Sequence, residues 1–433
     1  MRDVVLALSI LWFVYQGLRH PWIGVIGWTW ISIMNPHALS WNLRDMPVAA
    51  AIGGATLLGV LLTRDRKQFP LTRESITLMV FMAWMCIVLP FSFYWDNSYE
   101  LWNRIMKIDL MILVAMAVLH ERRHIMALAW MLVFSIGFFG VKGGMFTLAT
   151  GGSYRVWGPD GSYIGGNNEI ALALVMIIPL MRFLQLQTAN KWVSRGLLAS
   201  MLLCAIAALG SQSRGALLAI AAMTAVMWWR GKSKLAMGVV FVVLGIALIA
   251  FMPDSWTERM STIKTYDQDG SALGRLNAWW MAFNLAKDNF FGGGFMVSTP
   301  QLFAKYAPDP TDVHAAHSIY FMVLGEQGFV GLAIFLLLWL FVWLAAGRLR
   351  AQGRRQPETQ WVSDLGAMCQ VSLVGYAVGG AFLSLAYYDL PYNILVLTVI
   401  AGRWLDEKAW LRAPVAKPAS GRLASVLAAI GVK

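Results

Sequence analysis

The sequence is short of charged side chains. Only 13% of its 433 residues are charged, whereas 58% are hydrophobic. Soluble globular chains carry about 25% charged and roughly 45–50% apolar residues. One water-facing core cannot bury so much apolar surface, and a disordered chain needs the opposite bias. The composition therefore excludes both classes and predicts a polytopic membrane protein, whose apolar surface faces lipid.

Cysteine is also scarce. Cys86, Cys204 and Cys369 each lie inside an apolar stretch, which excludes a disulfide framework and a zinc knuckle. The sequence has no serine-hydrolase elbow, phosphate-binding loop or dinucleotide fingerprint in a suitable context. The three glycines at 292–294 follow an amphipathic stretch rather than a strand. We therefore expect no nucleotide or other cofactor.

Acidic residues are fewer than basic ones, 23 against 35, which gives a net charge of +12. Such a charge is typical of nucleic-acid binding or of the excess of Lys and Arg in cytoplasmic loops of membrane proteins. The position of the charges favours the second interpretation, without nucleic acid, because the basic runs are short and lie between apolar stretches. They occupy residues 64–67, 120–124, 182–195, 230–234 and 348–360.

The apolar stretches predict an all-α protein with twelve or thirteen transmembrane helices, because a span needs about 20 mainly apolar residues. The stretch from Val4 to Val14 resembles a signal peptide but has no convincing cleavage site, so we expect an uncleaved first span. The candidate spans are 4–18, 22–34, 47–63, 75–94, 104–119, 125–147, 167–184, 196–210, 213–229, 235–252, 316–346, 362–386 and 393–404.

If the basic runs are cytoplasmic, residues 95–103, 148–166, 211–215 and 253–315 lie on the periplasmic side of a bacterial inner membrane. Residues 253–315 form one long periplasmic loop, and loops of that length are usually functional. Within it, residues 276–286 predict an amphipathic helix in the membrane interface. The predicted regions are N-terminal helices at 1–147, a core with the long loop at 148–346, C-terminal helices at 347–404 and a cytoplasmic tail at 405–433.

Ionisable residues near the membrane are functional candidates because their burial is expensive. Arg214 lies between two apolar helices, where its guanidinium suits phosphate oxygens or the carbonyls of a tight turn. Lys142 ends an apolar span and either contacts substrate or extends its amine to the interface. Arg155 and Asn168 flank a glycine-rich outer loop that suits helix capping or contacts with sugar hydroxyls.

His314 and His317 stand three residues apart where a span begins on the outer side, and Glu326 follows further along it. Histidine with a near-neutral pKa can take a proton from a hydroxyl group. A metal site is the competing interpretation, but the spacing differs from that of zinc-binding helices and no carboxylate or cysteine set accompanies the pair. A purely hydrogen-bonding interfacial histidine is the third interpretation.

Several of these residues form motifs that resemble those of a known protein family. His317-Ser318, followed by Gly328 and Gly331, resembles the signature of the bacterial O-antigen ligases. The segment 211–215, with its Ser-Arg-Gly, and the segment from Gly274 through Trp280 to the glycines at 292–294 resemble the wider ligase and O-antigen polymerase superfamily. Residues 155–169 match the loop that opens its domain, and residues 141–144 look most like the exosortase A-associated O-glycosylation ligases. Phe290-Phe291 stands where the family usually has proline.

The resemblance implies a GT-C-like membrane glycosyltransferase that moves a glycan from an undecaprenyl diphosphate carrier to an acceptor hydroxyl at the periplasmic face. Arg214 and Arg275 would then stabilise the charge that grows on the diphosphate. His317 would act as the base, giving inversion without a metal ion. We assign secondary contacts with the substrates to Arg155, Lys142, His314, Glu326 and Asn168.

Other functions remain open from the sequence. A polymerase would use the same donor but extend a lipid-linked glycan. A transporter of lipid-linked glycan would need charges along a path across the membrane, and an exosortase-type protease would need a reactive cysteine at the outer face. The acceptor is also open between lipid A core and a protein hydroxyl, and membrane lipid is a further partner.

Overall fold

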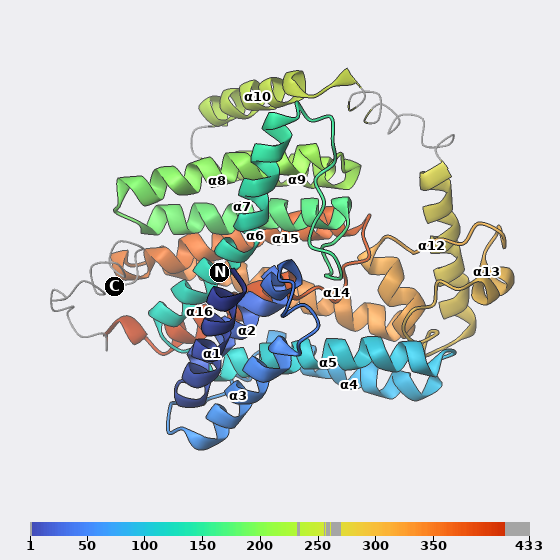
Figure 1. Ribbon diagram of the computed structural model, residues 1–433, viewed down its shortest axis with the longest axis horizontal. Helices are drawn as coiled ribbons and strands as arrows, with labels where there is room; N and C mark the ends of the chain where they lie inside the picture. Colours follow the sequence, from blue (N-terminus) through green and yellow to red (C-terminus); the bar gives the residue numbers. More distant parts are fainter. Residues whose placement is uncertain (1, 232–233, 255, 257–259, 261–269, 412–433) are drawn as a thin grey trace.

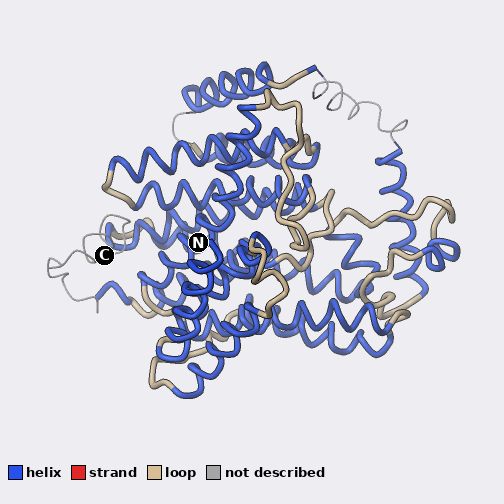
Figure 2. The backbone as a smooth tube through the Cα atoms, viewed as in Figure 1, coloured by secondary structure: helices blue, strands red, loops and turns tan. Residues whose placement is uncertain are grey.

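The computed structural model describes residues 2–231, 234–254, 256, 260 and 270–411. Helices and loops account for all of this part of the chain, which contains no strand (Figure 2). Of the tail predicted at 405–433, residues 412–433 lie outside the described residues. The α-helices are α1 (Arg2–Arg19), α2 (Pro21–Met34), α3 (Val48–Leu62), α4 (Arg73–Val88), α5 (Trp95–Val118), α6 (Arg122–Ala149), α7 (Asn167–Gln187), α8 (Lys191–Gly210), α9 (Arg214–Arg230), α10 (Lys234–Phe251), α12 (Gly270–Asp288), α13 (Pro300–Tyr306), α14 (Ile319–Gly353), α15 (Gln360–Gly380) and α16 (Asp389–Asp406).

Each candidate span from the sequence coincides with one of these helices, which confirms the all-α prediction. Within the described residues, five helical segments are long and apolar enough to cross a membrane: Arg73–Phe91, Arg122–Ala149, Asn167–Gln187, Lys191–Gly210 and Ile319–Gly353. The helices Pro21–Met34 and Val48–Leu62 are apolar but shorter. The protein is therefore a multi-pass membrane protein, and the count of twelve or thirteen crossings stays a prediction.

Helices α7 and α16 form the centre of the bundle. Most of their side chains are buried, including bulky ones such as Phe183 and Tyr392. Helix α7 packs against α6, α8 and α15, and α16 packs against α5, α14 and α15. A helix that is apolar on all sides is stable only where neighbours or lipid surround it, so these two helices take the interior and the others shield them.

The basic runs at 64–67 and 120–124 meet the end of α16 at one end of the bundle. Arg66 pairs with Glu407 at 2.7 Å, and His120 Nε2 lies 2.7 Å from the carbonyl oxygen of Arg66. Arg403 donates to the carbonyl oxygen of Gln68 at 2.6 Å. The chain ends of α3, α5 and α16 therefore meet there.

The predicted outer segments meet at the other end. The Val156 amide donates to the Gly210 carbonyl at 3.2 Å and that of Phe93 to the Gly293 carbonyl at 3.0 Å. Figure 1 shows α12 and α13 at this end, where α12 packs against both α13 and the long helix α14. Residues 276–286 are helical as predicted, within α12.

Helix α14 is interrupted at Gly328, whose φ of 68° and ψ of −175° are not helical. The loop after α12 enters this break: a Cβ on Gly328 would stand 2.4 Å from the carbonyl oxygen of Phe290, and one on Gly292 would stand 2.6 Å from the amide nitrogen of Gly328. Such contact excludes any side chain, so the glycines of two separate motifs allow one close approach.

Candidate functional site

His317 lies in the last residues before α14, at the end of the bundle where the predicted outer segments meet. Its φ of 41° places it in the left-handed region, which is rare for a residue other than glycine. Such backbone strain clusters at functional sites because surrounding contacts must hold it. Ser318 follows as the N-cap residue of α14.

The imidazole of His317 is partly buried, and its Nδ1 has no hydrogen-bond partner among the residues the structure describes. Burial lowers the pKa of His317 below its usual 6.5, and the positive charge of Arg275 and the neighbouring His314 lower it further. The ring is therefore neutral at neutral pH and can accept a proton. Nδ1 is the buried nitrogen of the ring.

Helix α12 packs against the segment that contains His314 and His317. The Trp279 indole donates to the carbonyl oxygen of Ala316 at 2.7 Å, and its ring stacks on Phe321 with centroids 4.8 Å apart. At Gly274 the two segments come so close that a Cβ would lie 2.4 Å from His314 Cδ2. These contacts determine the position of the histidine segment relative to α12.

Arg275 follows Gly274 on α12 and is partly buried. Its positive charge disfavours protonation of His317. It also attracts Glu169, in the first turn of α7. The structure therefore brings Arg275 and His317 together, although a long stretch of sequence separates them.

Arg214 is the first residue of α9, and Ser213 caps that helix by accepting a hydrogen bond from the Ala216 amide at 3.3 Å. A Cβ on the next residue, Gly215, would lie 3.3 Å from Phe382, just beyond the end of α15. The beginning of α14 reaches the same place, because a Cβ on Gly380 would lie 2.8 Å from Ile319. Arg214 and His317 thus stand at the starts of two helices that both pack on the end of α15.

Arg155 and α7 support the segment that precedes Arg214. The Arg155 guanidinium donates to Gln212 Oε1 at 3.2 Å, and Asn167 Nδ2 donates to the carbonyl oxygen of Ser211 at 2.8 Å. The buried neighbour Asn167 therefore makes this contact, while the predicted Asn168 is only partly buried.

Residues 199–336 match a family described as O-antigen ligase. Residues 1–189 match a family of unknown function, DUF5935, and no curated protein matches the chain. The first match contains His317, Arg214 and Arg275. It supports the O-antigen ligase superfamily.

In general terms, the ligase match points to a membrane glycosyltransferase with a lipid-linked glycan and an acceptor as substrates. The exosortase-associated branch and the GT-C-like architecture stay predictions.

Two predicted secondary residues lie away from the histidine segment. Lys142 is exposed on α6, where the adjacent Gly143 packs against Val156. Glu326 is buried, accepting hydrogen bonds from the Met296 amide at 3.1 Å and the Tyr387 hydroxyl at 2.8 Å. Glu326 thereby connects the loop after α12 to α14. These contacts give it a structural role.

His314 pairs with Asp312, Nε2 to Oδ1, at 2.7 Å. Within the described residues no three His, Cys, Asp or Glu side chains come together as a metal site would require. His314 is thus oriented by a carboxylate and lies beside Gly274, which suits a residue that positions the segment containing His317.

Sequence reasoning did not select Glu169, Asp312 or Trp279 as site residues. Glu169 ends the loop at 155–169, Asp312 lies two residues before His314, and Trp279 lies in the segment from Gly274 through Trp280. The signal for Glu169 and Trp279 was therefore present as part of a motif, but only the folded chain shows what each side chain contacts.

Proposed function

We propose that the protein is a glycan ligase, which transfers a glycan from an undecaprenyl diphosphate carrier to an acceptor hydroxyl at the periplasmic face of the inner membrane. The observation that carries the proposal is the pairing of Arg275 with His317, a neutral histidine on a strained backbone, inside the segment similar to O-antigen ligases. This pair combines a base with a fixed cation.

The reaction is a single displacement. Nε2 of His317 takes the proton of the acceptor hydroxyl while the oxygen attacks the anomeric carbon. The bond from that carbon to the diphosphate oxygen breaks, and its electron pair moves to the diphosphate. The new glycosidic bond has inverted configuration. A base of this kind typically contributes about 10²–10⁴-fold to the rate.

Arg214 and Arg275 stabilise the leaving diphosphate. Guanidinium groups bind phosphate oxygens through parallel hydrogen bonds and stay charged at any relevant pH. Fixed cations aimed at a growing negative charge are a principal source of catalysis. The diphosphate is already a good leaving group, so the site needs no acid, and we expect transfer without a divalent cation.

Purified protein, lipid-diphosphate-linked glycan and acceptor test this function in the presence of EDTA. We expect transfer by the parent, and loss of transfer with Arg214→Ala or Arg275→Ala at unchanged expression. Lys287→Ala, an exposed basic residue on the same helix as Arg275, is the control and should transfer normally. Full activity of both arginine variants would overturn their assignment.

The product separates the ligase from a polymerase with the same donor. A ligase makes one transfer to a lipid or protein acceptor, whereas a polymerase makes ladders of lengthening lipid-linked glycan. Mass spectrometry of the product also identifies the acceptor.

A further inference from the structure

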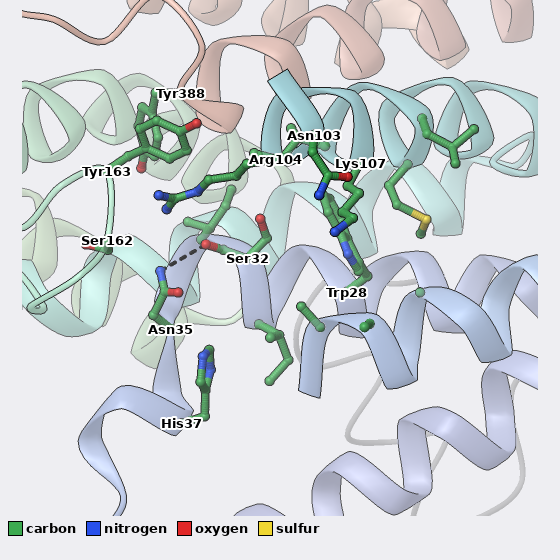
Figure 3. A pocket seen from close by; sticks show the side chains of 18 of the residues that line it. Trp28, Ser32, Asn35, His37, Asn103, Arg104, Lys107, Ser162, Tyr163 and Tyr388 are labelled. Atoms are coloured by element: carbon green, nitrogen blue, oxygen red, sulfur yellow. Dashed lines mark hydrogen bonds between the residues drawn. The ribbon is translucent and has the colours of Figure 1, made fainter. Parts of the chain in front are cut away.

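A pocket lies apart from the histidine segment and is lined mainly by residues of the N-terminal half of the chain. It has a volume of about 590 Å³ and lies between α2, α3 and α5, with Ser162, Tyr163 and Tyr388 at one side (Figure 3). Ser162 and Tyr163 belong to the outer loop that also carries Arg155, so the pocket is at the outer end of the bundle. None of Arg214, Arg275 and His317 lines it.

One side of the pocket is apolar. Trp28, Leu57 and the paired glycines Gly53 and Gly54 line it. A Cβ on Gly54 would meet no atom within 4 Å, so this glycine faces open space. An apolar wall on membrane helices that leaves room beside a glycine suits the hydrocarbon chain of a lipid.

The other side is polar and comes mainly from one face of α5. Arg104 and Lys107 are three residues apart, and Glu100 precedes Arg104 by one helical turn, so all three share that face. The Arg104 guanidinium stands 4.2 Å from the centroid of the Tyr163 ring. In Figure 3, Arg104 and Lys107 project from α5 into the pocket.

Charges of both signs line the pocket. Two cations, Arg104 and Lys107, line it together with the carboxylate of Glu100. Burial lowers the pKa of His37, so that ring adds no positive charge at neutral pH. A headgroup with both signs of charge fits this arrangement better than a purely anionic one.

We propose that this pocket binds a phospholipid whose headgroup carries a primary amine. The lipid phosphate lies between Arg104 and Lys107, and the ammonium donates to Glu100. Its acyl chains run along Trp28, Gly54 and Leu57. The site is separate from the transfer reaction, and its occupant is a lipid of the surrounding membrane.

Native mass spectrometry of the full-length protein tests this proposal, with phosphatidylethanolamine, phosphatidylglycerol and phosphatidylcholine of identical acyl chains as probes. We expect preferential retention of phosphatidylethanolamine. The double variant Arg104→Gln/Lys107→Gln should bind it about tenfold more weakly, since two charge-assisted hydrogen bonds are lost. Gly54→Leu fills the apolar side, keeps all charges and should also reduce binding.

The double variant Lys287→Gln/Lys305→Gln is the control, because it removes two exposed charges from outer segments away from the pocket. Its retention of phosphatidylethanolamine should match the parent. Equal or tighter binding of phosphatidylglycerol would overturn the headgroup assignment. Parent-like retention of phosphatidylethanolamine by both the charge variant and Gly54→Leu would overturn the site. Displacement of phosphatidylethanolamine by undecaprenyl phosphate or by millimolar inorganic phosphate would also overturn the proposal, because the pocket would then belong to another ligand.

Discussion

Catalysis in this account depends on keeping His317 neutral. Its lowered pKa comes first from burial and then from the nearby Arg275 charge. A histidine base works only in its unprotonated form, so transfer is lost as the pH falls through the pKa of His317 and is complete above it. Neutral pH therefore lies on the plateau.

Replacing Arg275 by Gln removes a positive charge, which raises the pKa of His317 toward its usual value. The acid limb of kcat/KM, which reports the free enzyme, should therefore move to higher pH in the residual activity of Arg275→Gln. Arg275→Lys keeps the charge and should keep the limb in place. Identical limbs in the parent and both variants would contradict the coupling of Arg275 to His317.

Gly274 tests how closely the histidine segment must be held. An added Cβ would stand 2.4 Å from His314 Cδ2 and 3.1 Å from Asp312 Oδ2, so Gly274→Ala displaces the pair. Small misplacements in a site are costly, and we expect transfer to fall about tenfold or more. Gly270→Ala is the control on the same helix, because a Cβ there meets open space. Equal activities of the two variants would refute the positioning role.

The break in α14 is the feature on which the arrangement of α12 depends. Gly328 has φ and ψ values that are essentially restricted to glycine, and its replacement costs about 1–3 kcal/mol in backbone strain. Gly328→Ala also forces a Cβ against Phe290. We expect a lower midpoint of thermal unfolding and reduced transfer. Gly196→Ala, at an open position inside α8, should not lower the midpoint, and equal midpoints for both would contradict this interpretation.

The sequence predicts most helices because apolar runs of spanning length are strong signals. It also points to Gly292 and Gly328 through two separate motifs. It does not show that these glycines contact each other, because that depends on where α12 folds back. The pairing of Arg275 with His317 is hidden for the same reason: Trp279 and Gly274 determine it through contacts between distant segments.

The pocket at Arg104 and Lys107 could not be predicted from the sequence. The sequence places both charges inside or beside an apolar stretch, yet gives no motif that separates them from interfacial residues. Tyr163, which contacts the Arg104 guanidinium, and Trp28, which lines the same pocket, come from other elements. Only the packing of α2, α3 and α5 makes a cavity there.

At the scale of the whole molecule, the outer loops and the basic runs occupy opposite ends of the bundle. We expect Trp157→Cys, in an exposed outer loop, to react with a membrane-impermeant maleimide in cells with a permeable outer membrane. Gln356→Cys, exposed at the basic end, should react only after the inner membrane is opened. The parent, with its three cysteines, provides the baseline. Reversed labelling would invert the proposed orientation.

The most direct test of the central claim is the product of one purified reaction, measured by mass spectrometry and by the anomeric coupling in its NMR spectrum. With EDTA present, the parent should give an acceptor heavier by one glycan, joined with inverted configuration. His317→Gln should leave the acceptor unmodified. An acceptor fully modified by the His317 variant, or a retained configuration in the parent product, would contradict the account.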